Sequence, residues 1–147
     1  MPLNRVRPPI LLVDDSPADV ELTLAALDDH PLGCRVHAVT DGEQALDFLQ
    51  RRGAYADRAP ELPSLVLLDL KMPKVDGLEV LRAIRADQDL RKVPVVVLTS
   101  SREEQDIVRS YDLGVNAYVV KPVGYAGFAA AVRQLGLFWI LHNETVA

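Results

Sequence analysis

The chain has 147 residues, 49% of them hydrophobic and 25% charged, which is the composition of a folded globular protein with a sizeable core. The formal net charge of -5 and the absence of a basic cluster argue against a nucleic-acid partner, because phosphate backbones require a cationic surface. No apolar stretch reaches the roughly 18 residues of a membrane span, and the first residues lack the apolar run of a signal peptide, so we expect a cytoplasmic protein without a membrane partner.

The cysteine and histidine content gives no sign of a disulfide, or of a metal site built from these residue types. Cys34 is the only cysteine, which excludes an intramolecular disulfide, and its apolar-alternating segment predicts a small core residue. His30, His37 and His142 show no metal-ligand spacing, and we expect them at the surface.

Short apolar runs alternate with helical patterns along the chain, which predicts parallel strands joined by helices. The first run, Ile10–Val13, has the pattern of a buried strand. Ser16 and Pro17 then combine an N-cap with a proline at the first helical position, so we expect a helix that ends near Asp29. Its buried face is expected to carry Val20, Leu24 and Leu27.

A second strand is predicted over residues 34–39, followed by a short helix that ends near Gly53. The sequence Thr40-Asp41-Gly42-Glu43 fits a capping box at the start of that helix. Residues 53–63 carry two prolines and few apolar side chains, and the strand pattern resumes directly afterwards. We therefore expect a surface loop there rather than a domain boundary.

The second half of the chain repeats the alternation. The third strand, residues 65–68, leads into Asp69, and Asp76-Gly77 opens a helix with Leu78, Leu81 and Ile84 at helical spacing. The remaining predicted elements are a strand that begins after Pro94 and ends at Thr99, a helix with a capping box at 101–104 and Gly114 as its C-cap, a strand at 117–120, and a last helix over roughly 124–141. The predicted fold is α/β, a doubly wound five-stranded parallel sheet with helices on both faces, in one domain over residues 1–147 with its core at about 9–141.

Chemically active side chains follow four of the predicted strands, at the carboxyl edge where open α/β sheets place their ligand sites. They are Asp14 and Asp15 after the first strand, Asp69 after the third, Thr99 after the fourth and Lys121 after the fifth. The three carboxylates would repel one another without a cation, and a few carboxylate oxygens suit Mg²⁺. An Asp-Asp pair at a strand end can instead cap a helix, but Ser16 already offers that cap. A lysine can pair with Asp69 and later bind a phosphoryl oxygen, to which Thr99 can also donate a hydrogen bond.

These motifs resemble the receiver domains of two-component response regulators, of which the chemotaxis regulator is a single-domain example. The likeness rests on Asp14-Asp15, on the stretch from Leu67-Leu68-Asp69 through Met72-Pro73 to Asp76-Gly77, on residues 94–101, and on Tyr118-Val119-Val120-Lys121-Pro122. Residues 53–63, residues 106–114 and Phe138-Trp139 extend it to the single-domain regulators paired with phytochrome-type histidine kinases. Lys71 departs from the asparagine that such relatives often carry, which bears on the lifetime of the phosphorylated state.

The resemblance implies a flavodoxin-like (βα)5 fold and a specific chemistry. Asp69 would accept the phosphoryl group from a sensor histidine kinase or a histidine phosphotransfer protein, with Mg²⁺ held by Asp14, Asp15, Asp69 and the backbone carbonyl of Lys71. Lys121 and Thr99 would neutralise charge on the transferring oxygens, and Thr99 and Tyr118 would switch the face formed by the fourth helix, fifth strand and fifth helix. The protein would thus be a phospho-accepting switch, not an enzyme, limited to self-directed phosphotransfer and autodephosphorylation.

Other functions remain open at this point. Within the family, the chain could be an intermediate carrier or a phosphate sink in a relay. A phosphatase with an aspartyl-phosphate intermediate would need a second acid/base aspartate near the nucleophile, and position 71 is lysine. An FMN-binding electron carrier would need a phosphate loop rich in glycine and hydroxyl residues where this chain has Asp-Asp-Ser-Pro. A DNA-binding output domain is not expected, because few residues follow the receiver pattern.

A run of five apolar residues near the C-terminus predicts self-association. Residues 137–141 span about 500° of helix, so the sheet can cover only some of their side chains. A large exposed apolar patch usually marks an interface, and Trp139 is a plausible anchor. We therefore expect a homodimer through the face formed by the fourth helix, fifth strand and fifth helix, with a C-terminal tail folded over these residues as the alternative.

Overall fold

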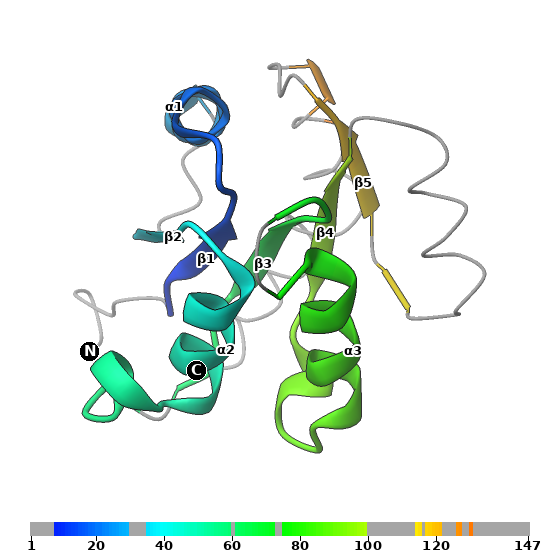
Figure 1. Ribbon diagram of the computed structural model, residues 1–147. Helices are drawn as coiled ribbons and strands as arrows, with labels where there is room; N and C mark the ends of the chain where they lie inside the picture. Colours follow the sequence, from blue (N-terminus) through cyan, green and yellow to red (C-terminus); the bar gives the residue numbers. More distant parts are fainter. Residues whose placement is uncertain are drawn as a thin grey trace, which may run out of the picture.

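The protein is described here from a computed structural model that covers residues 8–29, 35–59, 61–72, 75–99, 114–115, 117–121, 126–127 and 130; within these ranges the side chains of Asp28, Asp29 and Tyr118 are not described. Five parallel strands form one sheet in the order β2-β1-β3-β4-β5 (Figure 1). The strands are β1 (Ile10–Val13), β2 (Val36–Val39), β3 (Leu65–Asp69), β4 (Val95–Thr99) and β5 (Ala117–Val120). The predicted α/β fold class is confirmed, although the second strand begins at Val36.

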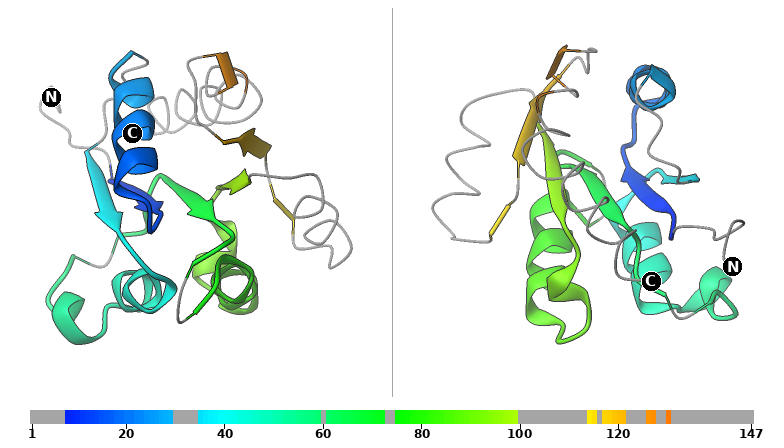
Figure 2. Two further views of the ribbon diagram at one scale, coloured as in Figure 1. Left: turned by 45° about the horizontal axis from the view of Figure 1, so that its top comes forward. Right: turned by 180° about the vertical axis from the view of Figure 1, so that it is seen from behind.

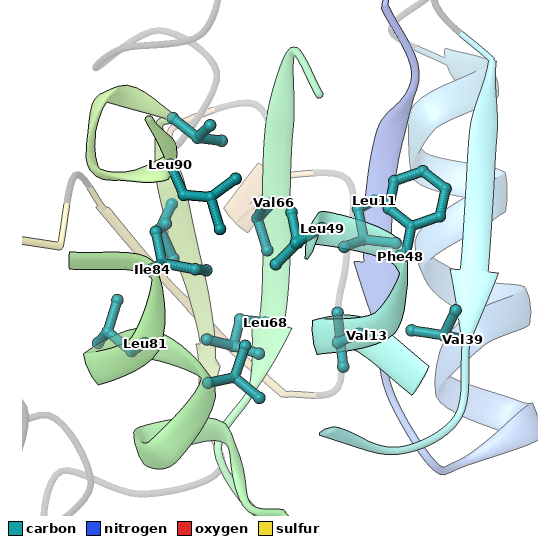
Figure 3. Close-up of a cluster of buried hydrophobic side chains, with 14 of the residues drawn as sticks. Leu11, Val13, Val39, Phe48, Leu49, Val66, Leu68, Leu81, Ile84 and Leu90 are labelled. Atoms are coloured by element: carbon teal, nitrogen blue, oxygen red, sulfur yellow. The ribbon is translucent and has the colours of Figure 1, made fainter. Parts of the chain in front are cut away.

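Helices lie on both faces of the sheet. Figures 1 and 2 show α1 (Pro17–Asp29) on one side, and α2 (Gly42–Gln50) and α3 (Gly77–Ala86) on the other. Alternate residues of each strand enter two separate cores, because successive side chains of a strand point to opposite faces. Leu11, Val13, Val66 and Leu68 pack with α2 and α3 (Figure 3). Ile10, Leu12, Leu65 and Leu67 pack with Ala26 and Leu27 of α1.

Side-chain caps lie at the starts of α1, α2 and α3, and one predicted cap was wrong by one residue. The Ser16 hydroxyl accepts a hydrogen bond from the Asp19 N–H at 3.3 Å, as expected for the N-cap of α1. The N-cap of α2 is Asp41, not Thr40: Asp41 Oδ1 accepts from the Gln44 N–H at 2.8 Å, and Gln44 Oε1 accepts from the Thr40 N–H at 3.2 Å. The capping box is therefore formed by Asp41 and Gln44, and the Asp41 side chain is buried at the helix start.

The buried faces of α1 and α3 are not limited to the residues at the expected spacing. Leu24 of α1 is 36% exposed, while Thr23 is fully buried and donates a hydrogen bond to the Asp19 carbonyl. Leu78 of α3 is half-buried, and Val80 is the fully buried residue of that turn. A hydroxyl that bonds within its own helix can occupy a buried position, which hydrophobic periodicity does not detect.

The segment after α2 is held to the sheet by an aromatic cluster. This segment begins with a 3-10 turn, η1 (Gly53–Tyr55). A second 3-10 turn elsewhere in the chain, η2 (Leu90–Lys92), follows α3. His37 stacks on Phe48 with ring centroids 4.8 Å apart and lies 3.0 Å from the Tyr55 hydroxyl, so this residue, expected at the surface, is half-buried. Burial, and secondarily the charge of Arg58, lower the pKa of His37. His30, His142 and Cys34 lie outside the described residues.

Several further predictions fall largely outside the described part of the chain. They are the capping box at 101–104, the helix that Gly114 would end, most of the last helix, and the apolar run at 137–141. Gly114 itself has a left-handed φ of 64°, as a C-cap glycine requires. Within the described ranges, no helix is both long enough and apolar enough to cross a membrane.

Candidate functional site

The sheet register brings the predicted site residues to one edge. Val13 of β1 pairs with Leu68 of β3, so Asp14 and Asp69 follow at the same level. Asp69 in turn pairs with Leu98, and Thr99 with Val120, which places Lys121 directly beyond. The Lys121 N–H donates to the Thr99 carbonyl at 2.8 Å, which fixes the end of β5 against β4. The parallel register alone therefore collects residues that lie more than 100 positions apart in the sequence.

Asp14, Asp15 and Asp69 form an acidic cluster at this edge. One carboxylate oxygen from each lies within 4.8 Å of the others. Asp14 and Asp69 are buried, whereas Asp15 is exposed and can reach a ligand from the solvent side. Asp14 Oδ2 is buried without a hydrogen-bond donor, although an ammonium lies at ion-pair distance. A buried lone pair beside two further carboxylates fits a divalent cation with oxygen ligands.

Lys121 is the cation of the site and contacts three carboxylates. Its Nζ lies 3.1 Å from Asp69 Oδ2, 3.1 Å from Asp14 Oδ2 and 2.9 Å from Asp19 Oδ2. The side chain is only 12% exposed. Burial by itself lowers the pKa of a lysine, but the hydrogen bonds to Asp19, Asp14 and Asp69 outweigh it and raise the pKa of Lys121 above its ordinary value. The ammonium is therefore charged at neutral pH.

Both oxygens of Asp69 are engaged from fixed directions. Oδ1 accepts a hydrogen bond from the Lys71 N–H at 3.1 Å, and Oδ2 accepts from Lys121 Nζ at 3.1 Å. Burial raises the pKa of Asp69 to about 6, against the lowering effect of Lys121 and the Lys71 N–H, and the negative charge of Asp14 adds to the rise. A carboxylate held in this way has a defined orientation and is poorly hydrated, as a buried nucleophile would be.

A glycine packs the start of α3 against the back of Asp69. The Gly77 N–H donates to the Leu70 carbonyl at 3.0 Å, and Asp76 caps the helix by accepting from the Glu79 N–H at 2.9 Å. A Cβ on Gly77 would overlap the Asp69 carbonyl oxygen and lie 2.5 Å from Leu70 Cα. Glycine is required here because no larger residue allows α3 to approach so closely.

The other predicted site residues have mixed outcomes. Thr99 is fully buried at the end of β4, and Lys71 directs its N–H at Asp69 while the residue as a whole is exposed. The backbone of Tyr118 lies in β5, but its side chain, and hence its predicted movement, falls outside the description. Sequence reasoning missed Asp19, whose contact with Lys121 is the shortest of the three. The signal that could have found it is an acidic residue in the first turn of the helix that follows Asp14-Asp15.

Comparison with known proteins gives consistent matches over nearly the whole chain. The sequence pattern described as "Response regulator receiver domain" matches residues 10–133. Response regulator Rcp1 of Synechocystis sp. is 42% identical over 137 residues, which cover 93% of this chain and 90% of Rcp1. Among solved structures, the bacteriophytochrome response regulator RtBRR is similar with a TM-score of 0.85 and 55% identity, over 88% of this chain and 78% of that one.

Two further solved structures are similar. The bacteriophytochrome response regulator AtBRR matches with a TM-score of 0.83 and 56% identity, over 90% of this chain and 95% of that one. The Mn(2+)-bound form of Rcp1 matches with a TM-score of 0.73 and 40% identity, over 89% of this chain and 93% of that one.

Proposed function

This chain belongs to the response regulator receiver domain family, whose members act as phosphorylation-controlled switches, and we propose that Asp69 is the residue that receives its phosphoryl group. The observation that carries the proposal is the state of this carboxylate. It is buried at the end of the central strand β3, and an N–H and an ammonium hold its two oxygens in a fixed orientation.

This geometry supports the following transfer step. A carboxylate oxygen of Asp69 attacks the phosphorus of a phosphohistidine on the partner. A new oxygen–phosphorus bond forms as the phosphorus–nitrogen bond breaks, and the histidine leaves as neutral imidazole once its nitrogen takes up a proton. Lys121 stays charged throughout and lies at hydrogen-bond distance from Asp69, so it stabilises negative charge on the transferring oxygens. The buried Thr99 hydroxyl is proposed to donate a hydrogen bond to the same group after transfer.

The acidic cluster is proposed to hold Mg²⁺ through Asp14, Asp15, Asp69 and the Lys71 carbonyl. The bound ion would neutralise charge between the incoming phosphoryl group and the carboxylates. The buried, undonated oxygen of Asp14 and the solvent-facing Asp15 support this assignment, and the related Rcp1 has been solved in a Mn(2+)-bound form. Reversal would occur by water attack on the aspartyl phosphate, at a rate that the exposed Lys71 influences.

We propose a phytochrome-type sensor histidine kinase as the phosphoryl donor, in the cytoplasm. The likeness to two bacteriophytochrome response regulators supports this partner over an unrelated kinase. A phosphatase function is less well supported. That chemistry needs an acid/base side chain close after the nucleophile. Position 71 is a lysine, and it contacts Asp69 through its backbone N–H and not through an acidic group.

Phosphotransfer profiling tests the proposal. Purified histidine kinases from the source organism are loaded with labelled phosphate and mixed with this protein. We expect the phytochrome-type kinase to be the fastest donor and Asp69→Asn to take no label. At pH 4, where Asp69 is largely protonated, Asp69→Asn should have the same melting temperature as the wild type. Labelling of Asp69→Asn at the wild-type rate would overturn the acceptor assignment, and a faster unrelated kinase would overturn the partner assignment.

We also propose a homodimer, on the strength of the apolar run at residues 137–141. The described edge strand β5 adds one exposed apolar side chain, Val120, which is 58% exposed. Sedimentation at tens of micromolar should give a dimer for the wild type and a folded, phosphorylatable monomer for Trp139→Glu. The matched control is Leu22→Glu, which changes an exposed leucine on α1 and should leave the dimer intact. A monomeric wild type in both phosphorylation states would contradict the proposal.

A further inference from the structure

We propose that Asp19 is a positioning residue of the phosphoryl-transfer site: it shares the Lys121 ammonium with Asp69 and thereby limits how tightly that ammonium can hold a phosphoryl group. The inference rests on the proposed function and adds a residue that lies on a helix, outside the strand ends that form the acidic cluster. Asp19 is not among the three carboxylates whose oxygens lie within 4.8 Å of one another, so it is a contact of the lysine and not one of the proposed metal ligands.

Each of the three N–H donors of the Lys121 ammonium already has a carboxylate acceptor, namely Asp14 Oδ1, Asp69 Oδ2 or Asp19 Oδ2. Four carboxylate oxygens lie within 3.2 Å of Lys121 Nζ: Asp14 Oδ1 at 3.2 Å, Asp14 Oδ2 at 3.1 Å, Asp69 Oδ2 at 3.1 Å and Asp19 Oδ2 at 2.9 Å. An ammonium group carries three N–H donors. A phosphoryl oxygen on Asp69 can therefore take a hydrogen bond from Lys121 only if one of the present acceptors gives up its share.

Asp19 is the acceptor that can be released at least cost. Its side chain is 25% exposed, whereas those of Asp14 and Asp69 are 0% and 7% exposed. A released Asp19 carboxylate can be hydrated, while a released Asp14 would leave a fully buried charge with only the Ser16 N–H, 3.0 Å from its Oδ1, as a hydrogen-bond donor. The Asp19 backbone stays in place, because its N–H bonds the Ser16 hydroxyl and its carbonyl accepts from the buried Thr23 hydroxyl at 2.8 Å. Only the side chain has to turn away.

Two opposite effects follow from the charge of Asp19. Its carboxylate competes with an anion on Asp69 for Lys121, so removing the charge should strengthen anion binding at Asp69. The same charge adds to the negative field at the acidic cluster, so removing it should weaken binding of a divalent cation. General damage to the fold would weaken both. Opposite signs are therefore a signature that a merely structural role cannot produce.

The test compares wild type, Asp19→Asn and the control Glu21→Gln, which removes an exposed carboxylate two residues further along α1. Beryllofluoride serves as the phosphoryl analogue, titrated at saturating Mg²⁺, and Mg²⁺ alone is titrated separately. Asp19→Asn should bind beryllofluoride about three- to tenfold more tightly and Mg²⁺ about two- to fivefold more weakly. Glu21→Gln should match the wild type in both titrations.

A double-mutant cycle with Lys121→Gln tests whether Asp19 acts through the lysine. The gain in beryllofluoride affinity from Asp19→Asn should vanish in the Lys121→Gln background. If Lys121→Gln does not fold, Asp19→Glu decides instead, because it keeps the charge and should return values close to the wild type. Unchanged or weaker beryllofluoride binding by folded Asp19→Asn would overturn the inference. Failure of the wild type itself to bind beryllofluoride would instead contradict the proposed function.

Discussion

At the scale of single residues, the site is a balance between one ammonium and four carboxylates. Lys121 contacts Asp14, Asp19 and Asp69, and Asp15 completes the cluster, so four negative charges and one positive charge leave a formal charge of -3. Part of this repulsion is relieved without a metal, because burial raises the pKa of Asp69 to about 6 and keeps it protonated in mildly acidic solution. A divalent cation would relieve it at neutral pH.

The raised pKa of Asp69 predicts an unusual pH dependence for the metal-free protein. Between the ordinary value of 3.8 and about 6, the folded state keeps a proton on Asp69 that the unfolded state has lost, so the free energy of unfolding falls as the pH rises. Asp69→Asn has no titrating carboxyl at this position, so its free energy of unfolding does not fall for this reason. Relative to the wild type, it should gain stability on the order of 2 kcal/mol between pH 4 and pH 7.

Urea unfolding of both proteins in chelator at a series of pH values measures this difference. A stability difference that stays constant over the range would show that Asp69 has an ordinary pKa when no metal is bound.

At the scale of the elements, strands were more predictable than helix details. Apolar runs identified β1, β3 and β4, because these parallel strands are buried on both faces and need no finer signal. The edge strand β2 is only partly buried, and its start was predicted two residues too early. Helix starts depend on single hydrogen bonds, which explains why the start of α2 was predicted at Thr40 and lies at Asp41. The contact of His37 with Tyr55 could not be predicted, since it joins a strand to a segment without helical or strand periodicity.

The close approach of α3 to β3 predicts a strong requirement for Gly77. Gly77→Ala should lower the free energy of unfolding by about 1–3 kcal/mol, because the added methyl overlaps the Asp69 carbonyl and the chain must shift. Gly127→Ala is the matched control. Its Cβ would lie 3.8 Å from Val119 Cγ1, and alanine favours a helix, so it should be neutral or stabilising by up to about 1 kcal/mol. Equal stability of the two variants in chemical denaturation would contradict the packing described here.

At the scale of the whole molecule, the strand order makes the site. The order β2-β1-β3-β4-β5 places β3 between β1 and β4, so Asp14, Asp69 and Thr99 converge although they are distant in the sequence. Strand-end chemistry was therefore enough to predict the acidic cluster and Lys121. It was not enough to predict Asp19, because a helix residue reaches the site only through the packing of α1 on the sheet, and periodicity does not specify that packing.

The same convergence predicts that divalent metal stabilises the folded state. Saturating Mg²⁺ should raise the melting temperature, with a gain of about 2.7 kcal/mol when its concentration is 100 times the dissociation constant. Asp15→Ala should lose most of this shift, because Asp15 supplies the exposed carboxylate of the cluster. Asp57→Ala, which removes an exposed carboxylate from the segment after α2, should keep it. A full Mg²⁺ shift in Asp15→Ala would remove that residue from the metal site.

Phosphorylation by a small donor tests the central assignment most directly, because it needs no partner protein. The chain is incubated with acetyl phosphate, with and without Mg²⁺, and its intact mass and modified peptide are determined. We predict one phosphoryl group per chain, dependent on Mg²⁺, labile to base, located on Asp69 and absent from Asp69→Asn. A phosphoryl group on another residue, or equal incorporation into Asp69→Asn, would contradict the assignment of Asp69 as the acceptor.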